Sequence, residues 1–253
     1  MTSLLFLALI QSLTEFLPIS SSGHLLLANL FGFSNQGLDI DIALHVGTLL
    51  AVILYFYHDI WEMFLLKNLR LMIQLIVATL PIIAIGLMIH FFHIPLLRGP
   101  FVIGICSIFF GWLLWKVDTK YPCHRKIDQM SYKDAFLIGV SQILALIPGT
   151  SRSGITMTCA RWRGFKREES ARFAMLLSIP TIALAALYMG WQAVTGNIIL
   201  PAPAQLNTAI IASAVFGLAA IAFLMKWVHK ASFFVFAFYR IVLGIIVLLY
   251  FAA

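Results

Sequence analysis

The chain has 253 residues, of which 62% are hydrophobic and 11% charged, and its mean hydropathy is +0.98. Because soluble domains carry about 25% charged residues, this composition excludes a soluble globular protein and indicates an integral membrane protein. The net charge of +7 does not indicate nucleic-acid binding, since the basic residues fall in short segments between apolar stretches, where they set membrane topology.

The first predicted element, residues 3–31, is interrupted by a short polar stretch. Pro18-Ile-Ser-Ser-Ser-Gly-His24 separates an apolar half from a second half that is too short to cross a membrane. Backbone that leaves the helical conformation at membrane depth needs protein or a water-filled cavity around it, because lipid cannot satisfy its N–H and C=O groups. We therefore predict a re-entrant hairpin of two half-helices that meet at a tip.

The rest of the chain predicts about six transmembrane helices and a second hairpin. In this hairpin, residues 133–163, Pro148-Gly-Thr-Ser-Arg-Ser-Gly154 makes the break. The six apolar stretches are each long enough to cross roughly 30 Å of hydrocarbon. They lie at residues 39–57, 70–91, 99–116, 168–190, 205–225 and 232–252.

The basic residues predict how these elements are oriented. They gather in four loops, which contain Lys67 and Arg70, Lys116 to Lys133, Arg161 to Arg172, and Lys226 and Lys230. With six true spans all four loops lie on one side, which the positive-inside rule makes cytoplasmic. The same layout makes the two hairpins enter from opposite faces, so that their tips meet.

An internal repeat relates the two hairpins. Adding 130 to the residue number takes Pro18 to Pro148 and Ser21 to Ser151. We therefore expect an all-α membrane fold, a single domain over residues 1–253, with inverted repeat halves at about 1–116 and 133–253. The discontinuous helices of such a repeat place a binding site near the bilayer midplane.

Two polar residues precede the first break. Gln11 and Glu15 are four residues apart and share one helix face, and Glu15 is the only acidic residue of its apolar segment. An ionisable group at membrane depth is costly and usually functional. Glu15 could instead hold the tips together by pairing with Arg152, and the two interpretations are compatible.

The tips themselves carry hydroxyl groups and one guanidinium. Serines that precede a helix are ordinary N-caps, yet two capped helix N-termini aimed at one point also form an anion site. Arg152 adds a planar fork suited to phosphate, unless it serves only as a counter-ion for Glu15. His24 is a candidate base, acid or nucleophile. The tip serines are Ser20, Ser21 and Ser22 in the first hairpin and Ser151 and Ser153 in the second.

Other polar residues are weaker candidates. We interpret His45, Gln142 and Thr156 as packing residues, and Arg240 as a residue that snorkels or pairs. Together, the carboxylate, the hydroxyls, the imidazole, the guanidinium and the helix N-termini suit phosphoryl transfer. In a membrane cavity this predicts a lipid phosphate as the substrate.

At these residues the chain resembles the undecaprenyl-diphosphate phosphatase family, also called bacitracin resistance proteins. The first family signature, (E/Q)-x-x-x-E followed by P-x-S-S-S/T-G-H, is matched by Gln11-Ser-Leu-Thr-Glu15-Phe-Leu-Pro-Ile-Ser-Ser-Ser-Gly-His24. The second, P-G-x-S-R-S-G-x-T, is matched by Pro148-Gly-Thr-Ser-Arg-Ser-Gly-Ile-Thr156. The resemblance covers essentially the whole chain.

The resemblance implies hydrolysis of undecaprenyl diphosphate to the monophosphate on the outer face of the bacterial cytoplasmic membrane, which recycles the lipid carrier of peptidoglycan synthesis and confers bacitracin resistance. By position, Glu15, Ser21, His24, Ser151, Arg152 and Thr156 fall on functional positions of the family, and Gln11 falls on its first acidic one. We predict catalytic roles for Glu15, Ser21, His24 and Arg152. We predict substrate contacts from Gln11, Ser20, Ser22, Gly23, Ser151, Ser153, Gly154 and Thr156. The chain has Gln11 where the family has its first acidic residue, so a role that needs a carboxylate there is lost or moves to Glu15.

The resemblance also implies a divalent cation, Mg²⁺ or alternatively Ca²⁺. Only Glu15 is an obvious acidic ligand, so we expect the ion to bind mainly through substrate oxygens and water. We hypothesise that Ser21 attacks the terminal phosphorus while Glu15 and His24 handle protons; an equally admissible version makes His24 the nucleophile. A homodimer is a further expectation.

Two other functions compete with a phosphatase. The inverted repeat alone predicts a polyprenyl-phosphate flippase or transporter. The asymmetry of the tips opposes this, since His24 occurs only in the first and Arg152 only in the second. A purely structural membrane protein leaves the concentration of polar residues at both breaks unexplained.

Overall fold

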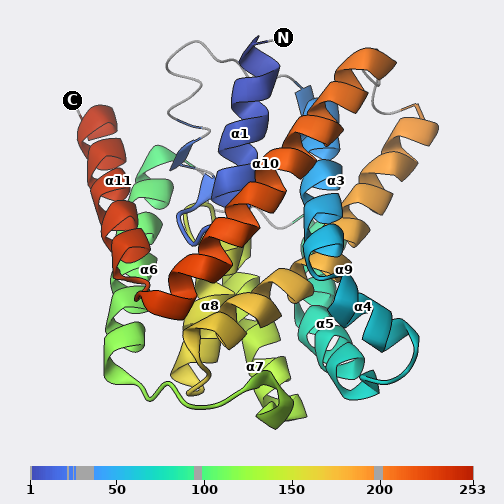
Figure 1. The fold of residues 1–253 in the computed structure, drawn as a ribbon. Coiled ribbons are helices and arrows are strands. Elements are labelled where there is room, and N and C mark those ends of the chain that lie inside the picture. Colours follow the sequence, from blue (N-terminus) through green and yellow to red (C-terminus); the bar gives the residue numbers. More distant parts are fainter. Residues whose placement is uncertain are drawn as a thin grey trace.

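The computed structural model describes residues 2–21, 23, 24, 26, 37–93, 99–196 and 202–252. Over these residues the fold is helical, with two short 3₁₀ turns at Ile127–Gln129 and Ile143–Leu146 (Figure 1). The helices are α1 Thr2–Phe16, α3 Gly37–Tyr55, α4 Tyr57–Phe64, α5 Leu69–Phe92, α6 Pro100–Lys120, α7 Tyr132–Gln142, α8 Arg152–Trp162, α9 Arg167–Val194, α10 Pro203–Lys230 and α11 Phe234–Ala252.

The described helices confirm an all-α, multi-pass membrane protein. Five of them, α5, α6, α9, α10 and α11, are long and apolar enough to cross a bilayer. A sixth span forms if α3 and α4 are taken together, with a bend of 76° between them. These six elements correspond to the six predicted stretches.

The helix ends differ from the prediction on the charged side. Lys116, Lys120, Lys226 and Lys230 were expected in loops, but all four lie within α6 and α10, with Lys120 and Lys230 in the last turns. Cations at a helix C-terminus interact favourably with the carbonyl end of the helix dipole, so these helices continue past the apolar stretch. Helix α4 was not predicted either, and its Asp59 forms an ion pair with Arg172 of α9.

The second predicted hairpin is represented by α7 and α8, which have 11 residues each and are therefore too short to cross a bilayer. Helix α7 begins, and helix α8 ends, at the end of the molecule that carries the basic loops. Residues 143–151 connect the two helices in the interior of the bundle (Figure 1). Helix α1 starts at the opposite end. The second arm of the first hairpin lies mostly outside the described residues, and re-entry into a bilayer stays a prediction.

The helix packing has a symmetric pattern. The short helix α1 packs on α10, and the short helix α7 packs on α5. Helix α3 packs on α10, and helix α9 packs on α5. In addition, α3 contacts α9, and α6 contacts α11. An inverted repeat over 1–116 and 133–253 would give such an exchange of partners between the halves, and the repeat itself stays a prediction.

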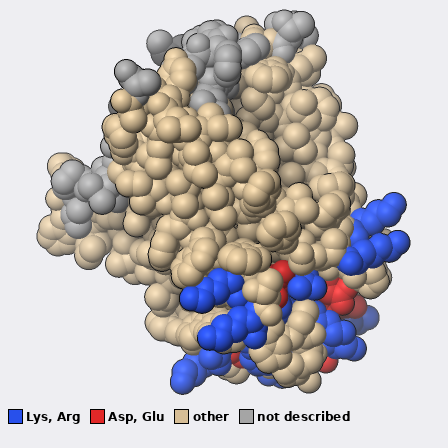
Figure 2. Space-filling view, turned by 90° about the vertical axis from the view of Figure 1, so that its left-hand side faces the viewer, with Lys and Arg blue, Asp and Glu red and all other residues tan. Residues whose placement is uncertain are grey.

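The charged side chains gather at one end of the bundle. Figure 2 shows Lys, Arg, Asp and Glu together at the end where α6, α8 and α10 finish and α7, α9 and α11 begin, while the rest of this face is uncharged. This agrees with the prediction that the four basic loops share one side.

Two buried aspartates organise this charged end. Asp118 accepts hydrogen bonds from Nε of Arg161 at 2.8 Å, from Nε of Arg167 at 2.8 Å and from the backbone N–H of Phe233 at 3.0 Å. It thereby joins α6, α8, α9 and the start of α11. The basic residues of these loops therefore also hold the second hairpin in place.

Asp134 makes the second cluster, at the start of α7. It accepts hydrogen bonds from Arg125 and Arg163, both at 2.7 Å, and it closes a capping box with Ser131. Burial alone raises the pKa of a carboxyl group, but these hydrogen bonds outweigh burial and hold the pKa of Asp134 well below its usual value. The carboxylate therefore stays charged at neutral pH.

Replacing Asp118 by alanine is expected to destabilise the protein by about 3–5 kcal/mol, because the guanidinium of Arg161 is fully buried and loses its counter-ion. Thermal unfolding in detergent, followed by size exclusion, measures this. Asp128→Ala is the matched control, since Asp128 is exposed, and it should leave the melting temperature unchanged. Equal melting temperatures for the two variants would contradict a structural role for Asp118.

Candidate active site

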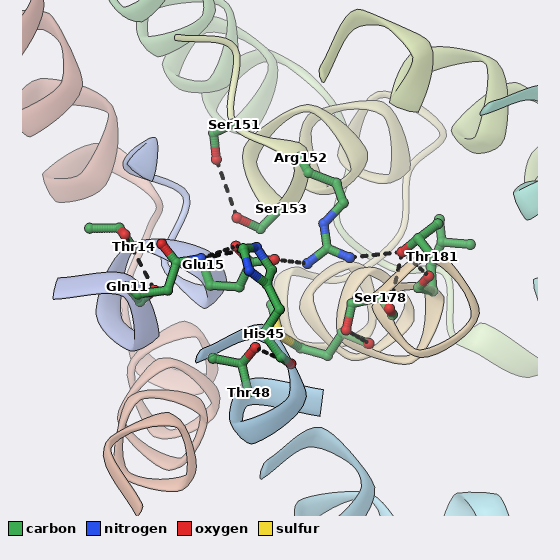
Figure 3. Close-up of polar contacts among 12 residues, drawn as sticks. Gln11, Thr14, Glu15, His45, Thr48, Ser151, Arg152, Ser153, Ser178 and Thr181 are labelled. Carbon is green, nitrogen blue, oxygen red and sulfur yellow. Dashed lines mark hydrogen bonds and ion pairs between the residues drawn. The ribbon is translucent and has the colours of Figure 1, made fainter. Parts of the chain in front are cut away.

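The two tips meet through an ion pair in the interior of the bundle. The guanidinium Nη2 of Arg152, the first residue of α8, donates to Oε1 of Glu15 on α1 at 2.6 Å (Figure 3). The Glu15 and Arg152 side chains retain 12% and 19% exposure, so the pair is enclosed but reachable. The predicted contact between Glu15 and Arg152 is therefore present.

Two further polar side chains reach the Glu15 carboxylate. The amide Nε2 of Gln11 donates to Oε2 of Glu15 at 3.3 Å and lies 3.1 Å from Nε2 of His45 on α3. The imidazole Nε2 of His45 is itself 3.9 Å from Oε2 of Glu15. The amide of Gln11 thus lies between the Glu15 carboxylate and the His45 imidazole. A side chain does not need a charge to make these contacts.

The other end of the Arg152 guanidinium is fixed by α9. Its Nη1 donates to Oγ1 of Thr181 at 2.9 Å, and Figure 3 shows the guanidinium between Glu15 and Thr181. The site therefore draws side chains from four helices, α1, α3, α8 and α9.

The second tip has a strained backbone. Gly149 has φ = +94°, and a Cβ at this position would lie 2.5 Å from the carbonyl oxygen of Ile103, so only glycine fits. Ser151 also has positive φ, at 66°, which is costly for a residue with a side chain. Ser151 is the N-cap of α8, because its Oγ accepts from the N–H of Gly154 at 3.2 Å. The strained turn thereby aims the positive end of α8 at the junction of the tips.

A second contact joins the tips beside the ion pair. Oγ of Ser153 donates to the carbonyl oxygen of Leu17 at 3.2 Å and lies 3.2 Å from Oγ of Ser151. This contact satisfies one carbonyl that the end of α1 leaves free. Ser153 therefore helps to hold the first tip against the second.

Arg240 of α11 holds the second tip by hydrogen bonds to its backbone. Its side chain is fully buried, and Nη2 donates to the carbonyl oxygens of Gly149 at 3.0 Å and Thr150 at 2.6 Å. A Cβ on Gly154 would lie 2.7 Å from Nη1 of Arg240, which explains a glycine there. Arg240 therefore neither snorkels nor pairs with a carboxylate among the described residues.

The first tip is described in part. Ser20 is buried, with φ = 73°, and Gly23 is buried against Leu243 and Ile103. Ser21 is half-buried and directly follows the strained Ser20. Ser22 lies outside the described residues. Each tip thus has a serine with positive φ directly before its second arm.

His24 is not brought together with Glu15 and Arg152. Its Nδ1 donates to the carbonyl oxygen of Ser20 at 2.7 Å, and its Nε2 lies 2.7 Å from the hydroxyl of Tyr239 on α11. It lines an apolar pocket between α1 and α11, whereas Glu15 contacts α3 and α8. The interpretation that groups His24 with Glu15 at one point does not hold in this arrangement, because the turn at Ser20 directs the imidazole to α11.

Thr156 and Gln142, two of the sequence candidates, lie beside the site rather than in it. The hydroxyl of Thr156 donates within its own helix, to the carbonyl oxygens of Arg152 at 2.8 Å and Ser153 at 3.1 Å. Gln142 is buried at the end of α7, and its amide has no hydrogen-bond partner among the described residues. A direct contact between Thr156 and a substrate is therefore not favoured.

The sequence interpretation ranked two residues of the site too low and missed a third. His45, interpreted as a packing residue, lies against Gln11 and Glu15; the rule that flagged Glu15, an ionisable group inside an apolar span, applies to it equally. The same rule applies to Arg240. Thr181 carried no such signal, because a single threonine is common in a transmembrane helix.

The site offers few ligands for a metal ion. Among the described residues, no three His, Cys, Asp or Glu side chains lie close enough to hold one. Glu15 and His45 are the two such groups at the junction of the tips. A divalent cation here would therefore need oxygen ligands from a substrate or from water, as is usual for Mg²⁺ beside phosphates.

The chemistry of this site points to a phosphorylated ligand. A planar guanidinium, the N-terminus of α8 and several hydroxyl groups converge at one depth of an apolar bundle, and each of them binds phosphate oxygens well. The carboxylate of Glu15 adds a group that can accept a proton.

Comparisons with known proteins agree with this chemistry. Residues 4–246 match the family model described as bacitracin resistance protein BacA. The chain is 46% identical over 251 residues to an undecaprenyl-diphosphatase of Hahella chejuensis, with 94% of this chain and 93% of that protein covered. It is also 43% identical to an undecaprenyl-diphosphatase of Jannaschia sp. over 263 residues, and 97% of each chain is covered.

Proposed function

The chain belongs to the bacitracin resistance protein BacA family, and from this premise we propose that it hydrolyses undecaprenyl diphosphate to undecaprenyl phosphate and inorganic phosphate. The observation that carries the proposal is the Glu15–Arg152 contact at 2.6 Å, which joins the two tips inside the bundle. Bacitracin resistance and recycling of the lipid carrier for peptidoglycan synthesis follow from this reaction.

In the proposed reaction Arg152 binds the phosphate oxygens and neutralises their developing charge. Thr181 holds one end of the guanidinium, so that the other end and the N-terminus of α8 face the substrate. The substrate would displace Arg152 in part from Glu15, which frees the carboxylate to accept a proton. The same ion pair thus keeps both groups in place before the substrate binds.

Ser21 is the nucleophile that we propose. Its Oγ forms a bond to the terminal phosphorus, the bridging P–O bond breaks, and undecaprenyl phosphate leaves; water then cleaves the phosphoserine to release phosphate. Ser21 follows the strained Ser20 at the tip, a usual setting for a reactive group. The alternative, attack by His24, is less favoured because both its ring nitrogens already have hydrogen-bond contacts.

The distribution of charge supports a proposed orientation in the membrane. The basic loops gather at one end of the bundle and are assigned to the cytoplasm, so the start of α1 faces outward. We propose the bacterial cytoplasmic membrane as the location and a site that opens to its outer face, where undecaprenyl diphosphate is released. A homodimer stays an expectation.

The direct test is release of inorganic phosphate from undecaprenyl diphosphate by the purified protein in detergent. A phosphatase releases phosphate under these conditions. A flippase built on the same repeat releases none, since no bilayer remains to transport across. Absence of phosphate from a folded preparation would overturn the proposal.

A divalent cation is part of the proposal, with Glu15 as its one protein carboxylate. When bound, the ion would neutralise charge on the phosphate oxygens. Chelation by EDTA is expected to stop phosphate release without lowering the melting temperature of the substrate-free protein, because the described residues form no metal cage. A drop of several degrees on chelation would show a resident structural ion instead.

A further inference from the structure

An apolar groove runs along the bundle next to the site, between α5 and α9. It has a volume of about 480 Å³ and is lined by Ile82, Ile83, Gly86, Leu87, His90, Thr181, Leu184, Ala185 and Tyr188. Because α5 begins at the charged end of the molecule and His90 lies near its other end, the groove occupies the half of the bundle away from the basic loops (Figure 1).

The groove and the phosphate site share one residue. Thr181 lines the groove and also accepts the hydrogen bond from Nη1 of Arg152 at 2.9 Å. A chain attached to a phosphate at Arg152 would therefore reach the groove at Thr181.

The walls of the groove suit a long hydrocarbon chain. Aliphatic side chains make up most of them, and Leu87 and Leu184 are 50% and 44% exposed, so the groove opens sideways to the surrounding lipid. His90 and Tyr188 form an edge-to-face pair at the far end, with ring centroids 6.0 Å apart. A chain lying in the outer leaflet can enter such a groove from the side.

From this shared residue we infer that the α5–α9 groove binds part of the isoprenoid chain of the substrate, namely the part nearest to the diphosphate. The inference rests on the proposed function and deepens it. Contacts with this chain would position the diphosphate at Arg152 and would make the enzyme prefer long-chain over short-chain prenyl diphosphates, because more buried apolar surface strengthens binding.

Gly86 gives a sharp test of the groove. Gly86 lines the groove, and a Cβ built on it has nothing within 4 Å, so the backbone there accepts a side chain and Gly86→Leu adds one to the groove wall. Glycine is also a poor residue for a helix interior, so this substitution favours α5. Ala185→Leu narrows the same groove from α9 and is a second, independent variant.

A neighbouring groove provides the matched control. Gly190, on another face of α9, lines a groove between α3 and α9 that contains none of the residues bonded to Arg152. A Cβ on Gly190 also has nothing within 4 Å. Gly190→Leu is therefore the same substitution, in the same kind of apolar groove, outside the proposed path of the chain.

The experiment compares kcat/KM for undecaprenyl diphosphate with kcat/KM for farnesyl diphosphate, which has a short chain, in detergent. Gly86→Leu and Ala185→Leu should lower the ratio of long-chain to short-chain kcat/KM at least about tenfold. Most of this change should appear as a higher KM for the long-chain substrate. A tenfold change corresponds to a loss of about 1.4 kcal/mol of binding free energy. Gly190→Leu should keep the wild-type ratio.

An unchanged ratio in Gly86→Leu and Ala185→Leu would overturn the inference and assign the groove to ordinary membrane lipid. A fall of the ratio in Gly190→Leu alone would move the chain to the α3–α9 groove and overturn it as well. Either result leaves hydrolysis intact, whereas a wild-type protein that releases no phosphate from either substrate refutes the proposed function itself.

Discussion

Replacing Arg152 by alanine is expected to slow phosphate release from undecaprenyl diphosphate by at least about 100-fold, the usual cost of removing one charge-stabilising donor from an active site. The variant loses the fork that binds phosphate oxygens and also leaves the Glu15 carboxylate without its partner at membrane depth. Initial rates at saturating substrate, measured on protein that elutes as a single peak, give the result.

Two further variants separate charge from geometry at this position. Arg152→Lys keeps the positive charge but not the planar fork, so an intermediate rate is expected. Thr181→Ala removes only the partner of Nη1, and it should cost less than Arg152→Ala because the contact with Glu15 remains. A well-folded Arg152→Ala protein with a near-normal rate would contradict the proposed site.

Glu15→Gln is the second variant with a large expected effect. It nearly preserves the shape of the side chain and removes the group that accepts a proton, which in enzymes contributes about 10²- to 10⁴-fold. The rate of phosphate release should fall within this range, while the melting temperature changes little.

Gln11 provides the comparison for Glu15. It lies on the same face of α1, is more deeply buried than Glu15 and donates a hydrogen bond to the Glu15 carboxylate, but it carries no charge. Gln11→Ala should therefore reduce the rate far less than Glu15→Gln does. Equal losses in both variants would mean that the site depends on packing around α1 rather than on the carboxylate.

The architecture of this protein follows largely from its sequence, because hydrophobic length and the placement of basic residues are strong signals in a membrane protein. The six apolar stretches and the gathering of the basic loops on one side have counterparts in the described residues, whereas re-entry of the two interrupted segments stays a prediction. The approach of Glu15 to Arg152 was also predictable, since an isolated carboxylate and guanidinium at the same depth stabilise each other.

The finer arrangement depends on turns that the sequence does not determine. The position of His24 is set by the backbone at Ser20, where a positive φ directs the next residues to α11 instead of α3. Thr181 and His45 join the site only because α9 and α3 cross beside it. Both contacts join distant segments, so the sequence shows His45 as an ionisable residue in an apolar span but does not show its partners, and it gives no signal for Thr181.

The buried arginines show a related limit. Arg161 and Arg240 are both fully buried, but one is neutralised by Asp118 and the other donates to two carbonyl oxygens of the second tip. In the sequence each is simply a basic residue, one assigned to a loop and the other to a span. Their partners decide their roles, and those partners lie far away in the chain.

The central claim is that Glu15 and Arg152 act as one unit where the two tips meet. A double-mutant cycle on kcat/KM, with Glu15→Gln, Arg152→Ala and the combined variant, tests it most directly. Residues that act as a unit are strongly non-additive, so the double variant should be within about tenfold of the slower single variant. Losses that multiply, so that the combined variant is slower by the product of both, would contradict the claim.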